Sequence, residues 1–290
     1  FMRLDKGVVK PVQYGLSDEQ IGDLESIGVK KIEDFTWKHL LDFYSCADCG
    51  RCSDQCPAAT VKRPLSPRFI TIKARDLLFK TFPVWGTPQP SPALVGGIFT
   101  EEEIWSCTTC GACEEECPLA IEYIDKIVDL RRGMIDDGLV PQSLQKPLSA
   151  LEKRGNPYGK SAKQRAKWID DPDFAKDVEV KLVDAETPAQ TLFFVDSVGS
   201  YDERIISITK AAARLLHHLG IDFGILGEEE KDAGNEVKRF GEEMLFQELK
   251  AHNTELIMEP KPSQIITVDP HTFNVLKKDY SGLPPVRHIT

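Results

Sequence analysis

The sequence predicts an α+β protein of more than one domain, with a helical first half and a small α/β second half built on a parallel sheet. All eight cysteines lie between positions 46 and 117, which divides the chain into a cysteine-rich half and a cysteine-free half. In the second half, short apolar runs alternate with stretches of helical period, as in βα repeats. A chain of 290 residues has room for about two domains.

We expect a helical domain over residues 1–150, a basic linker over 151–188 and the α/β domain over 189–290. Contact with an acidic partner or an anionic membrane surface is the alternative role of the basic segment. Its basic side chains surround Gly155, Pro157 and Gly159, and are Lys153, Arg154, Lys160, Lys163, Arg165 and Lys167.

The composition is that of a soluble globular protein, with 41% hydrophobic and 28% charged residues. The net charge of -10 argues against nucleic acid as a partner, because that binding depends on cationic side chains. No segment approaches the roughly 18–20 apolar residues that cross a bilayer, and we find no secretory leader. Since Phe1 precedes Met2, we expect an excerpt of a longer chain.

The eight cysteines form two runs of the same spacing, C-x2-C-x2-C-x3-C, each followed directly by proline. This run holds a [4Fe–4S] cluster in bacterial-type ferredoxins. Its two-residue gaps wrap a short loop around one face of a cube, so that three thiolates reach three irons. The runs are Cys46, Cys49, Cys52 and Cys56 before Pro57, and Cys107, Cys110, Cys113 and Cys117 before Pro118.

The fourth ligand of each cube is expected from the opposite run, as in other two-cluster ferredoxins. Four disulfides, two zinc sites, or one cluster with a relic of a second are the competing interpretations, and each fits the repeated spacing less well. The sequence therefore predicts two [4Fe–4S] clusters and no catalytic residue. One cluster is assigned Cys46, Cys49, Cys52 and Cys117, and the other Cys107, Cys110, Cys113 and Cys56.

Two features of the runs bear on the clusters' surroundings. Gly50 and Gly111 follow the second cysteine of each run, where a tight turn brings backbone amides close to the cluster. Glu114, Glu115 and Glu116 lie inside the second run. Negative charge there would lower the reduction potential of the second cluster, although a solvated acidic face is the simpler interpretation.

Helices are expected on both sides of the runs. Ser17–Gln20 has the pattern of a capping box, and Thr36 caps a helix on which Trp37, Leu40, Leu41 and Tyr44 form an apolar stripe. Further helices are expected over 67–79, with Ile70, Ile72, Leu77 and Leu78 inward, and over 121–135, with Ile124, Ile127, Val128 and Leu130 inward.

The second half predicts strands over 192–195, 223–226 and 265–268, and helices over 201–219, 236–252 and 273–280. On the first helix, Ile205, Ile208, Ala212 and Leu215 share one face. Ligands of parallel α/β folds gather at the carboxyl ends of the strands. The corresponding loops are 196–200, 227–234 and 269–272.

The chain resembles the iron–sulfur subunits of heterodisulfide reductase and its relatives, from about Asp34 to Thr290. Among these, it is most similar to membrane-associated oxidoreductases that move electrons between electron-transfer flavoprotein and quinone. The second half resembles one copy of the cysteine-rich CCG domain. The matching stretches are Cys46–Pro57, Pro64–Pro67, Trp105–Pro118, Val128–Arg132, Gly199–Arg204, Leu226–Glu230, Leu245–Leu249 and Pro270–Asn274.

One departure from that family concerns its CCG cysteines, which bind an unusual cluster or serve as active-site thiols. Their positions here are Ser197, Asp232, Ala233, Asp269 and Thr272. Hydroxyls and lone carboxylates are poorer ligands than thiolates for such a cluster, so we expect neither a third cluster nor disulfide cleavage in this domain. Asp232, Asp269 and His271 could instead form a polar pocket or a hard-metal site, or be solvated.

The resemblance implies a subunit that relays single electrons between a flavoprotein and a quinone or haem partner, with no substrate chemistry of its own. It also implies a cytoplasmic protein associated with the inner face of the membrane through partners or absent domains. The alternative is a subunit of a complex resembling heterodisulfide reductase, or one that oxidises glycerol 3-phosphate or lactate. A third hypothesis is an adaptor whose clusters only stabilise the fold.

Overall fold

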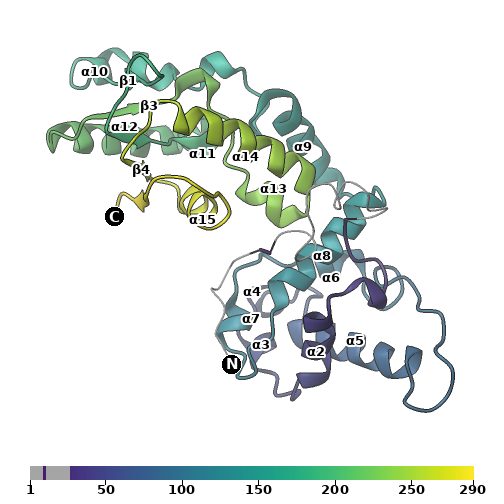
Figure 1. Ribbon diagram of the computed structural model, residues 1–290. Helices are drawn as coiled ribbons and strands as arrows, with labels where there is room; N and C mark the ends of the chain where they lie inside the picture. The colour runs from purple at the N-terminus through teal and green to yellow at the C-terminus, as the bar shows by residue number, and fades with distance from the viewer. Residues whose placement is uncertain (1–8, 11–26) are drawn as a thin grey trace. The chain divides into compact units, whose positions relative to one another are not determined.

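The computed structural model describes residues 9–10 and 27–290 and forms two compact units (Figure 1). One comprises the described residues up to Val140 together with Arg239–Glu242, and the other comprises Pro141–Lys238 and Glu243–Thr290. The predicted capping box at Ser17–Gln20 lies outside the described residues. The domain limits expected from the sequence stay a prediction.

The first unit is helical, and its helices are interrupted by the two cysteine loops. Helix boundaries follow capping side chains: the Thr36 hydroxyl accepts the His39 N–H, and Ser66 accepts that of Phe69. The elements are η1 (Ile32–Asp34), α2 (Trp37–Ser45), α3 (Arg51–Asp54), α4 (Pro57–Thr60), α5 (Pro67–Thr81), α6 (Glu101–Trp105), α7 (Ala112–Glu115) and α8 (Tyr123–Asp136).

The core of this unit lies between α2, α5, α6 and α8. Phe43, Ile70, Ile104 and Leu130 are buried in it. The inward residues predicted for α5 and α8 are buried, apart from Ile72, which is half-buried. The predicted stripe on α2 was partly wrong: Leu40 packs against the core, but Trp37 is 77% exposed and Leu41 is 51% exposed.

The fully buried side chains of α2 are His39, Asp42 and Phe43. Asp42 accepts hydrogen bonds from the Lys126 ammonium at 2.6 Å and from the Glu122 N–H at 3.2 Å. Lys126 is fully buried, and its ammonium also lies 5.6 Å from the centre of the Phe43 ring. This buried ion pair joins α2 to the first turn of α8.

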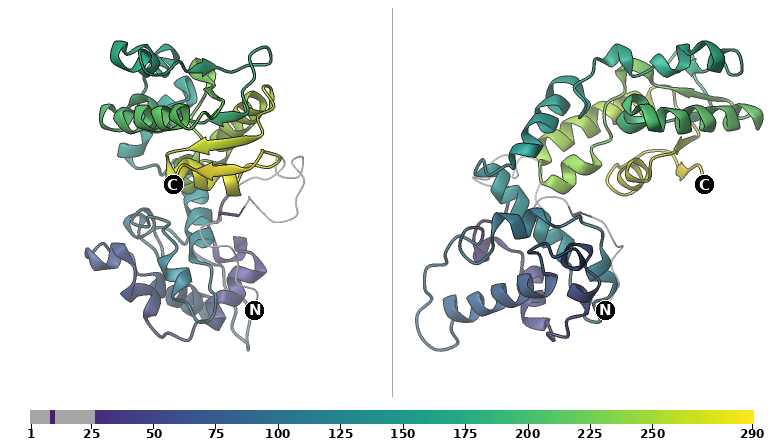
Figure 2. Two further views of the ribbon diagram at one scale, coloured as in Figure 1. Left: turned by 90° about the vertical axis from the view of Figure 1, so that its left-hand side faces the viewer. Right: turned by 180° about the vertical axis from the view of Figure 1, so that it is seen from behind.

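The second unit is a parallel sheet with helices on both faces (Figures 1 and 2). The strand order is β1-β3-β2-β4-β5, and every pair is parallel. Its elements are α9 (Gln142–Arg154), η2 (Ala162–Gln164), η3 (Lys167–Asp170), α10 (Pro172–Ala175), β1 (Lys181–Leu182), β2 (Thr191–Phe193), α11 (Asp196–Tyr201), α12 (Glu203–His218), β3 (Phe223–Ile225), η4 (Gly227–Glu229), α13 (Asn235–Phe240), α14 (Glu243–Met258), β4 (Gln264–Thr267), α15 (Pro270–Lys278) and β5 (Val286–His288).

Alternate residues of the central strands point to two separate cores, one on each side of the sheet. Leu192 packs with Phe246 of α14, whereas Phe193 packs with Ala213 of α12. Helix α12 buries Thr209, Ala212, Ala213 and Leu216. The face predicted for this helix was therefore partly wrong, since Ile208 and Leu215 are about half exposed.

Candidate functional site

The two cysteine runs fold into loops of the same backbone form. In the first, Asp48 and Gly50 have φ of 58° and 86°, and in the second, Thr109 and Gly111 have φ of 53° and 80°. A β-carbon on Gly50 would meet no atom within 4 Å, so the left-handed turn, not lack of space, favours glycine there. Each turn reverses the chain around the second cysteine and begins a short helix, α3 or α7.

The eight cysteines border two cavities. One is lined by Cys46, Cys49 and Cys52 of the first run and by Cys117 of the second. The other is lined by Cys107, Cys110 and Cys113 of the second run and by Cys56 of the first. Each cavity thus receives three sulfurs from one run and one from the other. All eight cysteines are free, so the structure does not support the disulfide interpretation.

The fourth cysteine of each run lies at the end of a short helix and turns the chain. Cys56 ends the turn that follows α3, and Pro57 occupies the first position of α4, where a missing N–H costs nothing. Pro118 follows Cys117, and Ala120 takes φ 54° before the chain enters α8. Proline thus stops the preceding helix from continuing past the cysteine.

Backbone and side-chain donors point at three of the sulfurs. Thr109 N–H donates to Cys107 Sγ at 3.3 Å, and Ile121 N–H donates to Cys117 Sγ at 3.4 Å. The Tyr123 hydroxyl lies 3.4 Å from Cys52 Sγ and donates to it. Hydrogen bonds of this kind tune a metal–thiolate site.

Burial is the main cause that raises the pKa of the Cys52, Cys107 and Cys113 thiols above the ordinary value. A coordinating thiol is deprotonated by the cation that it binds. Four sulfurs around each cavity are therefore a fitting donor set for iron, since soft thiolates select iron–sulfur clusters. The cavity around Cys107 is completed by apolar side chains such as Leu65, Ile70 and Ile127.

A buried arginine holds the start of the second loop. The Arg131 guanidinium donates to the Cys107 carbonyl at 2.6 Å and to the Ile104 carbonyl at 3.0 Å. It also lies 5.0 Å from the centre of the Trp105 ring. Arg131 lies in the matching stretch Val128–Arg132, but a guanidinium that binds carbonyls across the fold leaves no local motif of its own.

One further group of potential metal ligands occurs in the part of this unit that the structure describes, namely His39, Glu122 and Asp125. The Lys10 ammonium already pairs with both carboxylates. Burial and the nearby ammonium groups lower the pKa of His39 to about 2. This group is therefore an ion pair beside a neutral imidazole.

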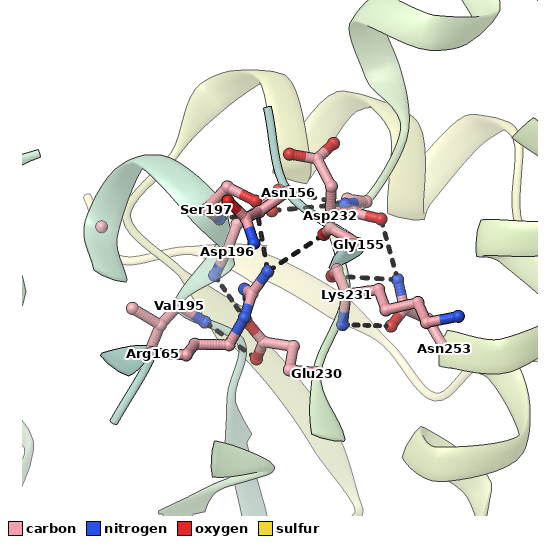
Figure 3. Close-up of polar contacts among 12 residues, drawn as sticks. Gly155, Asn156, Arg165, Val195, Asp196, Ser197, Glu230, Lys231, Asp232 and Asn253 are labelled. Atoms are coloured by element: carbon pink, nitrogen blue, oxygen red, sulfur yellow. Dashed lines mark hydrogen bonds and ion pairs between the residues drawn. The ribbon is translucent and has the colours of Figure 1, made fainter. Parts of the chain in front are cut away.

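In the α/β unit, a network of polar residues lies at the carboxyl ends of the strands (Figure 3). The Glu230 carboxylate accepts from the Arg165 guanidinium at 2.9 Å and from the Asp196 N–H at 2.8 Å. Arg165 and Glu230 are almost fully buried. Arg165 also donates to Ser197 Oγ at 3.2 Å. Arg165, from the segment predicted as a linker, thus joins Ser197, which follows β2, to Glu230, which follows β3.

Asp196 is the strained member of this network, with φ of 61° at the first residue of α11. Its carboxylate accepts the N–H groups of Ser197 and Ala233 and the Thr272 hydroxyl. Burial, followed by the charge of Asp232, holds the pKa of Asp196 well above its usual range. Ser197, Ala233 and Thr272 are thus brought together by hydrogen bonds to Asp196.

The structure does not bring Asp232, Asp269 and His271 together as a metal site. Asp269 caps α15, where its carboxylate accepts the N–H groups of His271 and Thr272. The exposed His271 ring pairs with Glu236. Asp232 Oδ1 accepts the Gly234 N–H at 2.9 Å. Each side chain thus has a local structural role.

Comparisons with known proteins agree with the cysteine geometry. Residues 45–121 match the profile of a family described as "4Fe-4S dicluster domain". The chain is 36% identical to the probable iron-sulfur-binding oxidoreductase FadF of Bacillus subtilis, over 88% of this chain and 41% of that protein. It is 33% identical to the EtfAB:quinone oxidoreductase of Syntrophomonas wolfei, over 93% of this chain and 42% of that protein.

A more distant relative is a component of the dihydromethanophenazine:CoB–CoM heterodisulfide reductase of Methanosarcina barkeri, 27% identical over 87% of this chain and 61% of that protein. The chain thus spans about two fifths of the first two relatives. A search of solved structures found no match. No helix in residues 9–10 and 27–290 is both long and apolar enough to cross a membrane.

The matched family confirms the two [4Fe–4S] clusters predicted as cofactors, and the relatives confirm the predicted resemblance. Residues 45–121 are a 4Fe-4S dicluster domain, in a chain homologous to the iron–sulfur oxidoreductases related to heterodisulfide reductase and EtfAB:quinone oxidoreductase.

Proposed function

We propose that this chain relays single electrons through two [4Fe–4S] clusters within an oxidoreductase complex, between a flavoprotein and a quinone or haem partner at the membrane. The observation that carries the proposal is the pair of cavities lined by four cysteines each. Bound clusters supply reversible one-electron chemistry. The chain's own residues hold them and bring hydrogen-bond donors to the sulfurs.

The ligand sets that we propose follow the two cavities. Three cysteines of one loop bind one cluster, and the fourth ligand crosses from the other loop. Crossing ties the two loops together, so that loading one cluster helps to fix the fourth ligand of the other. The proposed sets are Cys46, Cys49, Cys52 and Cys117 for the first cluster, and Cys107, Cys110, Cys113 and Cys56 for the second.

The partners are proposed from the relatives' names together with the chemistry of this chain. One relative is named for EtfAB and quinone, and another for the heterodisulfide of CoB and CoM. Flavins and quinones exchange electrons singly as well as in pairs, and one-electron carriers connect them. A quinone resides in the lipid, so the chain would work at the inner face of the membrane, through a partner or a further domain.

A heterodisulfide reductase-like, substrate-transforming role is the second candidate, favoured by the similarity to the Methanosarcina heterodisulfide reductase. It requires thiol or cluster chemistry on the α/β part. At the strand ends of that part, Arg165 instead pairs with Glu230, whose carboxylate also accepts the Asp196 N–H. We propose that this domain, over residues 189–290, orients the helical domain of residues 1–150 toward partners through the segment 151–188.

The test uses the whole chain, reconstituted anaerobically with iron and sulfide. We expect about eight irons per chain and an absorbance near 400 nm that a reduced electron-transfer flavoprotein bleaches. Cys49→Ala and Cys110→Ala are matched variants, each expected to lose one half of the bleached absorbance. About twelve irons per chain would favour the second candidate. Bleaching by dithionite but by neither flavoproteins nor quinols would refute the proposed relay.

A further inference from the structure

Tyr123 is a side chain shared by both cysteine-lined cavities. It lines the cavity of Cys46, Cys49, Cys52 and Cys117, and also the cavity of Cys56, Cys107, Cys110 and Cys113. The ring is buried, and its hydroxyl donates to Cys52 Sγ at 3.4 Å. Tyr123 therefore forms part of the wall between the two sites and binds a sulfur of one of them.

The structure fixes this ring from both sides of the chain. The N–H of the preceding residue, Glu122, donates to Asp42 of α2 at 3.2 Å. The N–H of the following residue, Ile124, donates to the Glu114 carboxylate at 2.8 Å. Tyr123 is thus held between α2, which leads into the first run of cysteines, and α7, which lies inside the second run. Its position is set by the fold that surrounds both sites.

We propose that Tyr123 is a positioning residue that raises the reduction potential of the cluster held by Cys46, Cys49, Cys52 and Cys117 relative to the other cluster. The proposal rests on the ligand sets given under the proposed function. A hydrogen bond to a ligand sulfur stabilises the cluster more when it has gained an electron, because the sulfur then carries more negative charge. The tyrosine hydroxyl supplies this bond to one site only, at Cys52.

The neighbouring site has a different kind of donor. Cys107 Sγ accepts the backbone N–H of Thr109, which a side-chain substitution leaves in place. The Glu114 carboxylate, next to Cys113, adds negative charge there, while the Arg131 guanidinium near Cys107 adds positive charge. These charges act on the second site with or without the Tyr123 hydroxyl, so removing that hydroxyl changes the difference between the two potentials.

The test is a potentiometric titration of the whole reconstituted chain, followed by electron paramagnetic resonance. In Tyr123→Phe, which keeps the ring and loses the hydroxyl, we expect the midpoint of the cluster with Cys52 to shift to lower potential while the other midpoint stays. Cys49→Ser identifies which signal belongs to the Cys52 site. Tyr280→Phe is the matched control, since it removes a buried hydroxyl from the α/β unit, and neither midpoint should shift.

Iron and sulfide contents distinguish this inference from the proposed function. If the unsubstituted chain holds two clusters and Tyr123→Phe leaves both midpoints unchanged, or shifts both equally, the role of Tyr123 is refuted while the relay stands. If the unsubstituted chain does not hold two clusters, both fail. If Tyr123→Phe loads fewer irons, Tyr123→Trp is used as well, because its indole N–H keeps a donor. The proposal is supported if the midpoint of the cluster with Cys52 lies closer to that of the unsubstituted chain in Tyr123→Trp than in Tyr123→Phe.

Discussion

Replacing Glu230 with alanine is expected to destabilise the α/β unit by about 3–5 kcal/mol, because it leaves a buried guanidinium without its partner. Arg165 and Glu230 keep only 3% and 1% of their side-chain surface exposed. The same carboxylate also accepts the N–H groups of Asp196 and Val195 at the end of β2. The substitution therefore removes one ionic and two backbone contacts together.

The loss of stability in Glu230→Ala combines the lost ion pair with the lost backbone hydrogen bonds, and two further variants help to separate them. Glu230→Gln keeps an oxygen for the two amides that follow β2 but loses the charge opposite Arg165, and should cost less, about 1–3 kcal/mol. Asp173→Ala is the matched control, because the Lys176–Asp173 pair is largely exposed. An exposed pair contributes at most about 1 kcal/mol.

Native-state hydrogen exchange measured by mass spectrometry follows this unit separately from the helical one. Peptides that cover β2 and β4 report its opening. A loss of about 3–5 kcal/mol corresponds to an increase in exchange of between about one hundred-fold and several thousand-fold, at 1.4 kcal/mol for each tenfold change. If these peptides exchanged no faster in Glu230→Ala than in Asp173→Ala, the Arg165–Glu230 network would not be what stabilises the strand ends.

Three further outcomes are expected. Because burial raises the folded-state pKa of Asp196, its protonated form is favoured by folding, so the stability of the α/β unit should fall as pH rises above about 4, the ordinary value. Asp196→Asn should make that fall shallower in denaturant titrations at several pH values, and an unchanged slope would contradict this. Gly133→Ala should destabilise the helical unit by about 1–3 kcal/mol in thermal unfolding, since its β-carbon would lie 2.5 Å from the Val29 carbonyl oxygen, and a gain in stability would show that the loop gives way. Thr100→Ala should cost about 1 kcal/mol in the same assay, because the capping box with Glu103 at the start of α6 is lost, and no change would contradict the role of the cap.

The cysteine pattern was the most informative part of the sequence, because the ligands of each loop are close along the chain. A spacing of three residues and a glycine with positive φ are local properties, so they could be predicted without the fold. The crossing of Cys56 and Cys117 was inferred from the behaviour of two-cluster ferredoxins. The two cavities agree with this inference, and the ligand assignment stays a proposal.

The polar interior could not be predicted, because its partners are distant in sequence. Lys126 binds Asp42, which lies 84 residues away, and Arg165 binds Glu230, which lies 65 residues away. Lysine and arginine are rarely buried unless they are paired, and a sequence does not show the pairing. From the sequence alone, Arg165 is accordingly predicted to be part of a charged linker.

Helix faces and edge strands were wrong or missed for a related reason. Trp37 and Leu41 are apolar but exposed, so the spacing of apolar residues alone gave the buried face of α2 only in part. The edge strands β1 and β5 have only two and three residues, too short for a recognisable alternation. The helix predicted over 236–252 is divided at Gly241, which has φ of 92° between α13 and α14.

The crossing of ligands between the two loops is tested most directly by serine substitution of single cysteines, followed by electron paramagnetic resonance of the reduced, reconstituted chain. Cys117→Ser should alter the same signal as Cys49→Ser, and Cys56→Ser should alter the same signal as Cys110→Ser. If Cys117→Ser instead altered the signal that responds to Cys110→Ser, each loop would hold its own cluster and the crossed arrangement would be wrong.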